Sequence, residues 1–87
     1  MQPDETRQRI KAFVEKQFPL ARTRQVAMDY PLLENGIVDS MGVLDLVSFL
    51  EGEYHITIDD EDLVPEHFQT IGRLADFVHT KLGRAAA

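Results

Sequence analysis

The sequence predicts a small all-α protein, a four-helix bundle with a long loop between its first and second helices and a short third helix. Apolar residues recur at helical spacing in three separate segments. The one alternating segment, Ile56-Thr57-Ile58, is too short to form a strand without a partner. A chain of 87 residues has the length of one small domain with a single core. We therefore expect one domain over residues 1–87, with its core over about 4–83.

The first helix is expected over residues 4–18. Its apolar residues follow the i, i+3, i+4, i+8 pattern of an amphipathic helix. They are Ile10, Phe13, Val14 and Phe18. Asp4 is a suitable N-cap, and Pro19 is expected to stop the helix.

Residues 19–38 show no sustained period and predict the long loop. They contain Pro19, Pro31 and the turn pair Asn35-Gly36. Apolar residues within the loop are expected to hold it against the core. These are Val26, Met28, Leu32, Leu33 and Ile37. A loop of this length in a compact domain is usually functional or mobile.

The second helix is expected from Ser40 to Tyr54, with two different faces. The core face is formed by Val43, Leu46, Val47, Leu50 and Tyr54. Met41, Leu44 and Ser48 lie roughly opposite, together with Asp45 and Glu51. Apolar residues among carboxylates are unusual on a purely solvated surface, so this second face is a candidate docking surface.

The rest of the chain predicts a linker, two short turns and a final helix. Ile56 and Ile58 anchor the linker, and Asp59 or Asp60 opens an acidic turn that ends at Leu63 and Val64. Pro65 suits the start of the short third helix, which directs Phe68 inward. Thr70 caps the last helix and Gly83 ends it, leaving a frayed tail over 84–87. The apolar stripe of that helix is Ile71, Leu74, Ala75, Val78 and Leu82.

The charges are unevenly distributed along the chain, which has a net charge of −6. Six of the nine Lys and Arg residues lie within residues 1–24, and none lies between Arg24 and Arg73. That stretch carries eleven carboxylates, including four in a row from Asp59 to Asp62, for which the sequence predicts mutual repulsion. The acidic balance argues against nucleic-acid binding. The acidic surface is either a solvated face or a docking surface for basic partners.

Composition excludes several other classes of protein. The chain has no cysteine, so it has no disulfide, thiol nucleophile or Cys-based zinc site. Neither a signal peptide nor a membrane span is predicted, and we expect a cytoplasmic monomer. A chain this short has little room for a catalytic cleft, so we do not expect an enzyme and expect no metal.

The chemistry is expected at one serine. Asp39-Ser40 lies where the long loop meets the second helix. With Asp39 as the N-cap, the Ser40 hydroxyl lies near free N–H groups and the positive end of the helix dipole. A phosphate attached to Ser40 would be favourably placed.

The segment Gly36-Ile37-Val38-Asp39-Ser40-Met41 resembles the attachment motif of carrier proteins that bear 4′-phosphopantetheine, the acyl and peptidyl carrier proteins. Ser40 matches the modified serine, Asp39 the preceding acid and Met41 the following apolar residue. The resemblance covers nearly all of residues 4–83 and fits a stand-alone member. It extends to four further segments of the chain. They are residues 32–36 before the motif, the second helix with Leu46, Leu50, Glu51 and Tyr54, the linker Ile56-Thr57-Ile58 with the acids after it, and Phe68-Gln69-Thr70-Ile71.

The resemblance implies transport rather than catalysis. A phosphopantetheinyl transferase would move the cofactor from coenzyme A to Ser40, and its thiol would hold an acyl group as a thioester. Activating ligases, ketosynthases or acyltransferases of fatty acid or polyketide synthesis would be the later partners. The expected docking residues are Met41, Leu44, Asp45, Ser48, Glu51 and, more weakly, Glu53.

Other interpretations remain open from the residues. Gly42 resembles the D-S-M-G motif of D-alanyl and other aminoacyl carriers, so an aminoacyl or peptidyl carrier is the main alternative. An unmodified acidic interaction module is another. A serine hydrolase would need a G-x-S-x-G elbow and a base among His55, His67 and His79. A calcium module at Asp59, Asp60, Glu61 and Asp62 lacks the EF-hand spacing.

Overall fold

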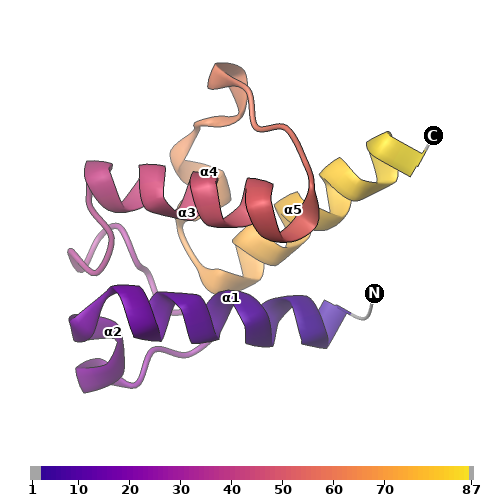
Figure 1. Cartoon of the computed structure of the whole chain (residues 1–87). Coiled ribbons are helices and arrows are strands. Elements are labelled where there is room, and N and C mark those ends of the chain that lie inside the picture. The colour runs from indigo at the N-terminus through magenta and orange to yellow at the C-terminus, as the bar shows by residue number, and fades with distance from the viewer. Residues whose placement is uncertain (1–2, 87) are drawn as a thin grey trace.

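The computed structural model describes residues 3–86, with side chains for residues 5–83, and this part of the chain is helical without strands (Figure 1). The α-helices are α1 (Pro3–Gln17), α2 (Pro19–Arg24), α3 (Ser40–Tyr54), α4 (Pro65–Phe68) and α5 (Ile71–Ala86), and η1 (Asp60–Asp62) is a 3-10 turn. The predicted all-α fold is confirmed. Within residues 3–86, no helix has both the length and the apolar character that crossing a membrane would require.

Helices α1 and α3 lie side by side and run in opposite directions, with α5 crossing behind them (Figure 1). Three contacts join α1 to α3 at regular steps of one helical turn. They are Arg9 to Glu53, Phe13 to Phe49, and Gln17 to Asp45. The middle contact is a ring stack with centroids 4.2 Å apart. Helix α1 therefore supports α3 along most of its length.

The core contains the stripes that the sequence predicted. From α1 and α3 it includes Ile10, Val14, Leu46, Leu50 and Tyr54. From α5 it includes Ile71, Leu74, Ala75 and Val78. Phe68 of α4 is also buried, as predicted, whereas Val43, Val47 and Leu82 pack at the edge of the core. Burial of this apolar surface is the main force that holds so small a chain together.

The expected loop over 19–38 is wrong at its start, because residues 19–24 form α2. Pro19 occupies the first turn of this helix and Phe18 is its N-cap. Proline has no backbone N–H, and the first turn of a helix does not need one. Pro19 can therefore prevent α1 from continuing and also begin α2. Helix α2 stops at Gln25, whose φ of 51° is left-handed. The loop proper covers residues 25–39.

Two predicted helix ends also differ from the structure. Helix α1 begins at Pro3, so Asp4 lies inside the helix rather than at its N-cap. Helix α5 continues through Gly83 to Ala86, and the predicted frayed tail is helical up to that residue. A glycine weakens a helix by about 1 kcal/mol relative to alanine but does not have to end it.

The short elements begin where the sequence placed them. The Thr70 hydroxyl accepts a hydrogen bond from the Arg73 N–H at 3.0 Å and so caps α5. Asp59 is the N-cap of η1, and Pro65 is in the first turn of α4. Ile56 is buried and Ile58 half-buried, so the linker has the two anchors expected of it.

The carboxylates of Asp59 and Asp62 have a cation that the sequence did not reveal. Lys81 of α5 contacts the Asp62 carboxylate, and its Nζ lies 3.9 Å from the Asp59 carboxylate. The Lys81 side chain is only 11% exposed and lies over the Phe77 ring. The predicted repulsion within the acidic run is therefore offset by Lys81, which follows Asp62 by 19 residues in the sequence.

We expect Lys81→Met to lower the melting temperature at low ionic strength by several degrees. Methionine keeps the apolar stem of lysine but leaves the carboxylates facing one another. A loss of about 1 kcal/mol corresponds to about 4–8 °C in a domain of this size. Because salt screens the repulsion, the deficit should shrink between about 0.01 M and 1 M NaCl. Thermal melts that match the wild type at low salt would contradict this assignment.

Candidate functional site

Ser40 is the first residue of α3 and follows a loop that is fixed to the rest of the fold. The Leu32 N–H donates to the Gln69 carbonyl at 2.8 Å, and the Gly72 N–H donates to the Met28 carbonyl at 2.9 Å. Both bonds tie the loop to the beginning of α5. The loop therefore delivers Ser40 to a defined position.

The residues just before Ser40 turn the chain into the helix. Gly36 has a φ of +70°, a left-handed conformation that glycine adopts without a steric cost. Ile37 and Val38 follow and are buried. Asp39 is extended, and its carboxylate accepts the Gly42 N–H at 2.8 Å, so the predicted N-cap is confirmed.

The Ser40 side chain itself is exposed. It lies at the end of α3 where backbone N–H groups are free and the helix dipole is positive. The first turn of α3 itself contains no acidic residue, and the neighbouring carboxylate of Asp39 is engaged as the cap by the Gly42 N–H. An exposed hydroxyl at this position fits a phosphate ester, because it is accessible and the local field favours negative charge.

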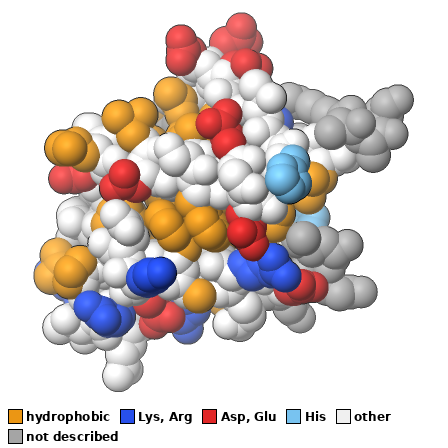
Figure 2. Space-filling model, in the orientation of Figure 1, with side chains coloured by type: hydrophobic (Ala, Val, Ile, Leu, Met, Phe, Trp, Pro, Cys, Tyr) orange, Lys and Arg blue, Asp and Glu red, His pale blue; other side chains and the backbone are white. Residues whose placement is uncertain are grey.

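The exposed face of α3 beside Ser40 is apolar and acidic. Met41 is 75% exposed and Leu44 60%, the highest values among the large apolar side chains of residues 5–83. Asp45 and Ser48 are exposed on the same helix. Figure 2 shows hydrophobic side chains at the upper left of this view, over the start of α3. We call Met41, Leu44, Asp45 and Ser48 the α3 face.

Two carboxylates predicted to face a partner are engaged within the fold. Glu51 is half-buried and its carboxylate accepts the Ile58 N–H at 2.9 Å, which fastens the linker to α3. Glu53 accepts a hydrogen bond from Arg9 at 2.6 Å, and this bond raises the pKa of the Arg9 guanidinium. Asp45 makes only one long bond, from the Gln17 amide at 3.4 Å. The structure thus leaves Asp45 as the carboxylate free to meet another molecule on this face.

Sequence reasoning missed what lies under the start of α3. A Cβ added to Gly42 would stand 2.8 Å from Cε1 of Phe18 and 3.0 Å from Cγ1 of Val38. Phe18 in turn packs edge-on against Phe13. Because Gly42 has no side chain, the first turn of α3 can pack directly against the Phe18 ring. Packing accounts for Gly42 without reference to the kind of cargo.

Replacing Gly42 with alanine should destabilise the protein by about 1–3 kcal/mol, the usual cost of overpacking. The contact is too close for a Cβ, and this cost exceeds the gain of about 0.5–1 kcal/mol in helix propensity. Gly52, on the same helix, has no atom within 4 Å of an added Cβ. Gly52→Ala should therefore stabilise the fold by that smaller amount. Denaturant unfolding of the two variants checks the opposite signs.

The three histidines lie in separate parts of the fold. His55 is the C-cap of α3, about 20 Å from Ser40 at 1.5 Å of rise per residue. The His67 ring stacks on Phe77, with centroids 4.4 Å apart. His79 is half-buried in the interior of α5. Among the described residues, no hydrogen bond joins Ser40 to a histidine.

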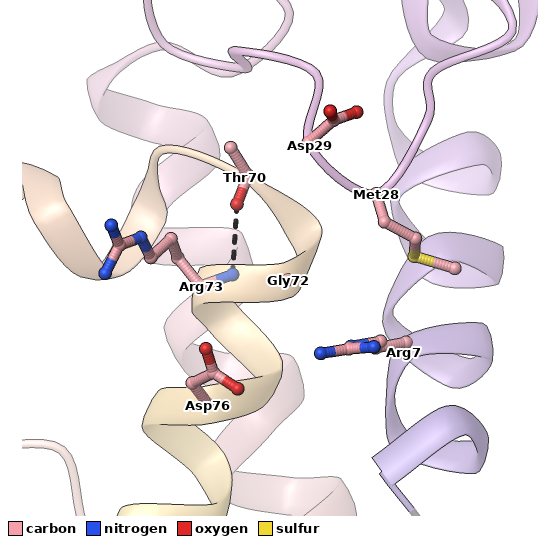
Figure 3. A pocket seen from close by; sticks show the side chains of 7 residues that line it. All are labelled: Arg7, Met28, Asp29, Thr70, Gly72, Arg73 and Asp76. Atoms are coloured by element: carbon pink, nitrogen blue, oxygen red, sulfur yellow. Dashed lines mark hydrogen bonds between the residues drawn. The ribbon is translucent and has the colours of Figure 1, made fainter.

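A separate open hollow of about 290 Å³ lies between α1, the loop and the first turn of α5 (Figure 3). Its lining mixes guanidinium and carboxylate groups and contains none of the α3 face. The lining residues are Arg7, Met28, Asp29, Thr70, Gly72, Arg73 and Asp76. The hollow is therefore not the surroundings of Ser40.

Comparisons with known proteins match most of the chain. The family model described as "Phosphopantetheine attachment site" matches residues 8–78, which include the loop, Ser40 and the α3 face. An acyl carrier protein of Thermotoga maritima is 28% identical over 75 residues, which cover 86% of this chain and 89% of that protein.

Proposed function

This chain belongs to the phosphopantetheine attachment site family, whose prosthetic group is a covalently attached 4′-phosphopantetheine, and on that premise we propose that Ser40 carries the group. We further propose that the chain transports acyl intermediates as thioesters between biosynthetic enzymes. The observation that supports Ser40 is its exposed hydroxyl at the capped N-terminus of α3.

Attachment requires an accessible oxygen and a partner enzyme that activates it. A phosphopantetheinyl transferase would direct the Ser40 oxygen at the phosphate of coenzyme A that bears the pantetheine. An O–P ester bond forms, the pyrophosphate bond breaks, the nucleotide leaves and the serine proton passes to the transferase. Once attached, the group supplies the terminal thiol that this cysteine-free chain lacks.

The chain's own residues contribute position and recognition. The Asp39 cap and the loop hold Ser40 at the start of α3, and the α3 face presents Met41 and Leu44 beside it. Asp45 adds a negative charge that would meet basic residues of the transferase and later enzymes. We leave Glu51 and Glu53 out of this docking surface, because both carboxylates are held within the fold.

Intact-mass measurement tests the carrier function. The purified chain is incubated with coenzyme A and a broad-specificity phosphopantetheinyl transferase. We expect a gain of one phosphopantetheine per chain. An unmodified chain after complete reaction of a control carrier would favour the alternative of an acidic interaction module.

The class of cargo needs a second experiment. The chain purified from its own cells is fragmented so that the arm is released together with its thioester. A mass that fits a carboxylic acid without a basic nitrogen supports the acyl carrier. A cargo that carries an amine would instead support the aminoacyl or peptidyl alternative.

Asp45→Lys should slow phosphopantetheine transfer mainly through a lower association rate. Exposed charges at the edge of an interface steer encounter, and each contributes about 0–1 kcal/mol. The fold should be unaffected, because Asp45 makes only a long hydrogen bond. Initial rates at subsaturating carrier should fall about threefold or more at low ionic strength, with a smaller difference in high salt.

Asp29→Lys is the matched control, since it makes the same change of charge on the loop beside the hollow. If the rates of the two variants fall equally, net charge rather than the α3 face controls encounter. If Asp45→Lys reacts at the wild-type rate at low salt, Asp45 belongs to a solvated surface only.

A further inference from the structure

The positive charges of the fold divide into two groups. Arg9 is paired with Glu5 and Glu53, and Lys81 with Asp59 and Asp62. By contrast, Lys16 at the end of α1 and Arg22 in α2 form no ion pair with any residue in the described part of the chain. Arg24 makes only two long hydrogen bonds, to the Tyr30 hydroxyl at 3.5 Å and the Asn35 carbonyl at 3.4 Å. Lys11 and Arg73 also have no ion pair in the described part of the chain. Lys16, Arg22 and Arg24 differ from these two in lying close together in the sequence, within residues 16–24.

An apolar side chain lies among these cations. Helix α2 buries only Ala21, so most of its surface is open. Leu20 is 45% exposed, and on a helix it lies on the same side as Arg24 four residues later. Figure 2 shows Lys and Arg side chains over α1 and α2 on the lower half of this view, with some acidic side chains among them and a hydrophobic side chain at the lower left. Arg22 is two residues from both Leu20 and Arg24 and therefore lies on the other side of α2. We call Lys16, Leu20 and Arg24 the basic face.

The basic face lies next to Ser40 in space. Phe18, the N-cap of α2, meets the first turn of α3 at Gly42, and Gln17 contacts Asp45 of the α3 face. The end of α1, α2 and the start of α3 lie at one end of the molecule (Figure 1). A protein large enough to reach the arm on Ser40 would therefore come close to both faces.

We propose that the basic face is a second docking surface, and that it binds an acidic protein surface with an apolar contact for Leu20. This inference rests on the proposed function only in that the partner also reaches Ser40. An acidic partner is repelled by most of a chain with a net charge of −6 and is attracted where the cations gather. The two faces of opposite charge would thus fix the orientation of one partner over Ser40.

A protein fits this face better than a nucleic acid. Nucleic-acid binding draws its affinity from several neutralised phosphates, and the acidic bulk of this chain would oppose a long polyanion. An exposed leucine contributes little to a phosphate backbone, whereas an apolar contact ringed by charge is the ordinary anatomy of a protein interface. The occupant we infer is an acidic, amphipathic protein surface.

The test uses NMR titration of the ¹⁵N-labelled full chain with a synthetic helical peptide in which Leu recurs every third or fourth position among Glu residues. Shift changes should concentrate on residues 16–24 and fade in about 0.5 M NaCl. Arg24→Glu should weaken binding about threefold to fivefold, and Leu20→Ala about fivefold.

Matched variants separate the face from bulk charge and from apolar surface in general. Arg73→Glu makes the same change of charge at the start of α5, and Leu63→Ala removes another exposed leucine. Both should bind the peptide as the wild type does. All four variants change exposed side chains, so their melting temperatures should stay close to the wild-type value.

Three outcomes would overturn the proposal. They are no measurable binding, equal weakening by Arg24→Glu and Arg73→Glu, or tighter binding of a single-stranded oligonucleotide of matched charge at the same residues. Ser40 takes no part in this titration. If the peptide does not bind, the proposed attachment at Ser40 is unaffected. If Ser40 gains no mass, the result of the peptide titration still holds.

Discussion

The Ser40→Ala chain should gain no mass when it is incubated with coenzyme A and a phosphopantetheinyl transferase, while the wild type is converted completely. Alanine has no oxygen that can form the phosphate ester, so the loss is total rather than graded. The substitution should not disturb the fold. Ser40 is exposed, and alanine is a better helix former than serine.

The sequence supplies a matched control for this experiment. It contains only two serines, Ser40 and Ser48, and both lie on α3 and are exposed. Ser48 lies about two turns into the helix, away from the free N–H groups of its first turn. Ser48→Ala should therefore be modified as the wild type is. A mass gain on Ser40→Ala that disappears in the double variant would move the attachment to Ser48.

Local sequence patterns predicted those features of the fold that depend on near neighbours. The apolar stripes of α1, α3 and α5 follow the helical period, and their central residues are buried. Asp39 and Thr70 are caps because their side chains reach N–H groups three residues later. The exposure of Met41 and Leu44 follows from the same period. Each of these depends on geometry within two or three turns of one helix.

The features that could not be predicted depend on residues far apart in the chain. Proline can follow the end of one helix or lie in the first turn of another, and the sequence alone did not show that Pro19 begins α2. The fit of Gly42 on Phe18 and the pairing of Lys81 with Asp62 arise when helices pack. Glu51 was predicted to face a partner. In the structure its carboxylate accepts a hydrogen bond from the Ile58 N–H of the linker. Composition and periodicity contain no signal for such contacts.

Leu46→Ala should destabilise the protein by about 2–5 kcal/mol, the usual loss for a buried leucine. Leu46 is fully buried in the core cluster, so its truncation removes apolar contacts and leaves a cavity. A small domain has only about 5–15 kcal/mol of stability in total, so this loss is a large fraction of it. Urea or thermal unfolding measures the difference directly.

Leu44→Ala, two residues earlier on the same helix, should behave in the opposite way. Its side chain is 60% exposed, so truncation should change stability by no more than about 0.5 kcal/mol. If Leu44 fills a pocket on the transferase, the same change should weaken that encounter by about 1–2 kcal/mol. The chemistry of the two substitutions is identical, so position alone separates their effects. A Leu44→Ala chain that unfolds as easily as Leu46→Ala would mean that the two faces of α3 had been exchanged, and the α3 face could not then be the surface that partners meet.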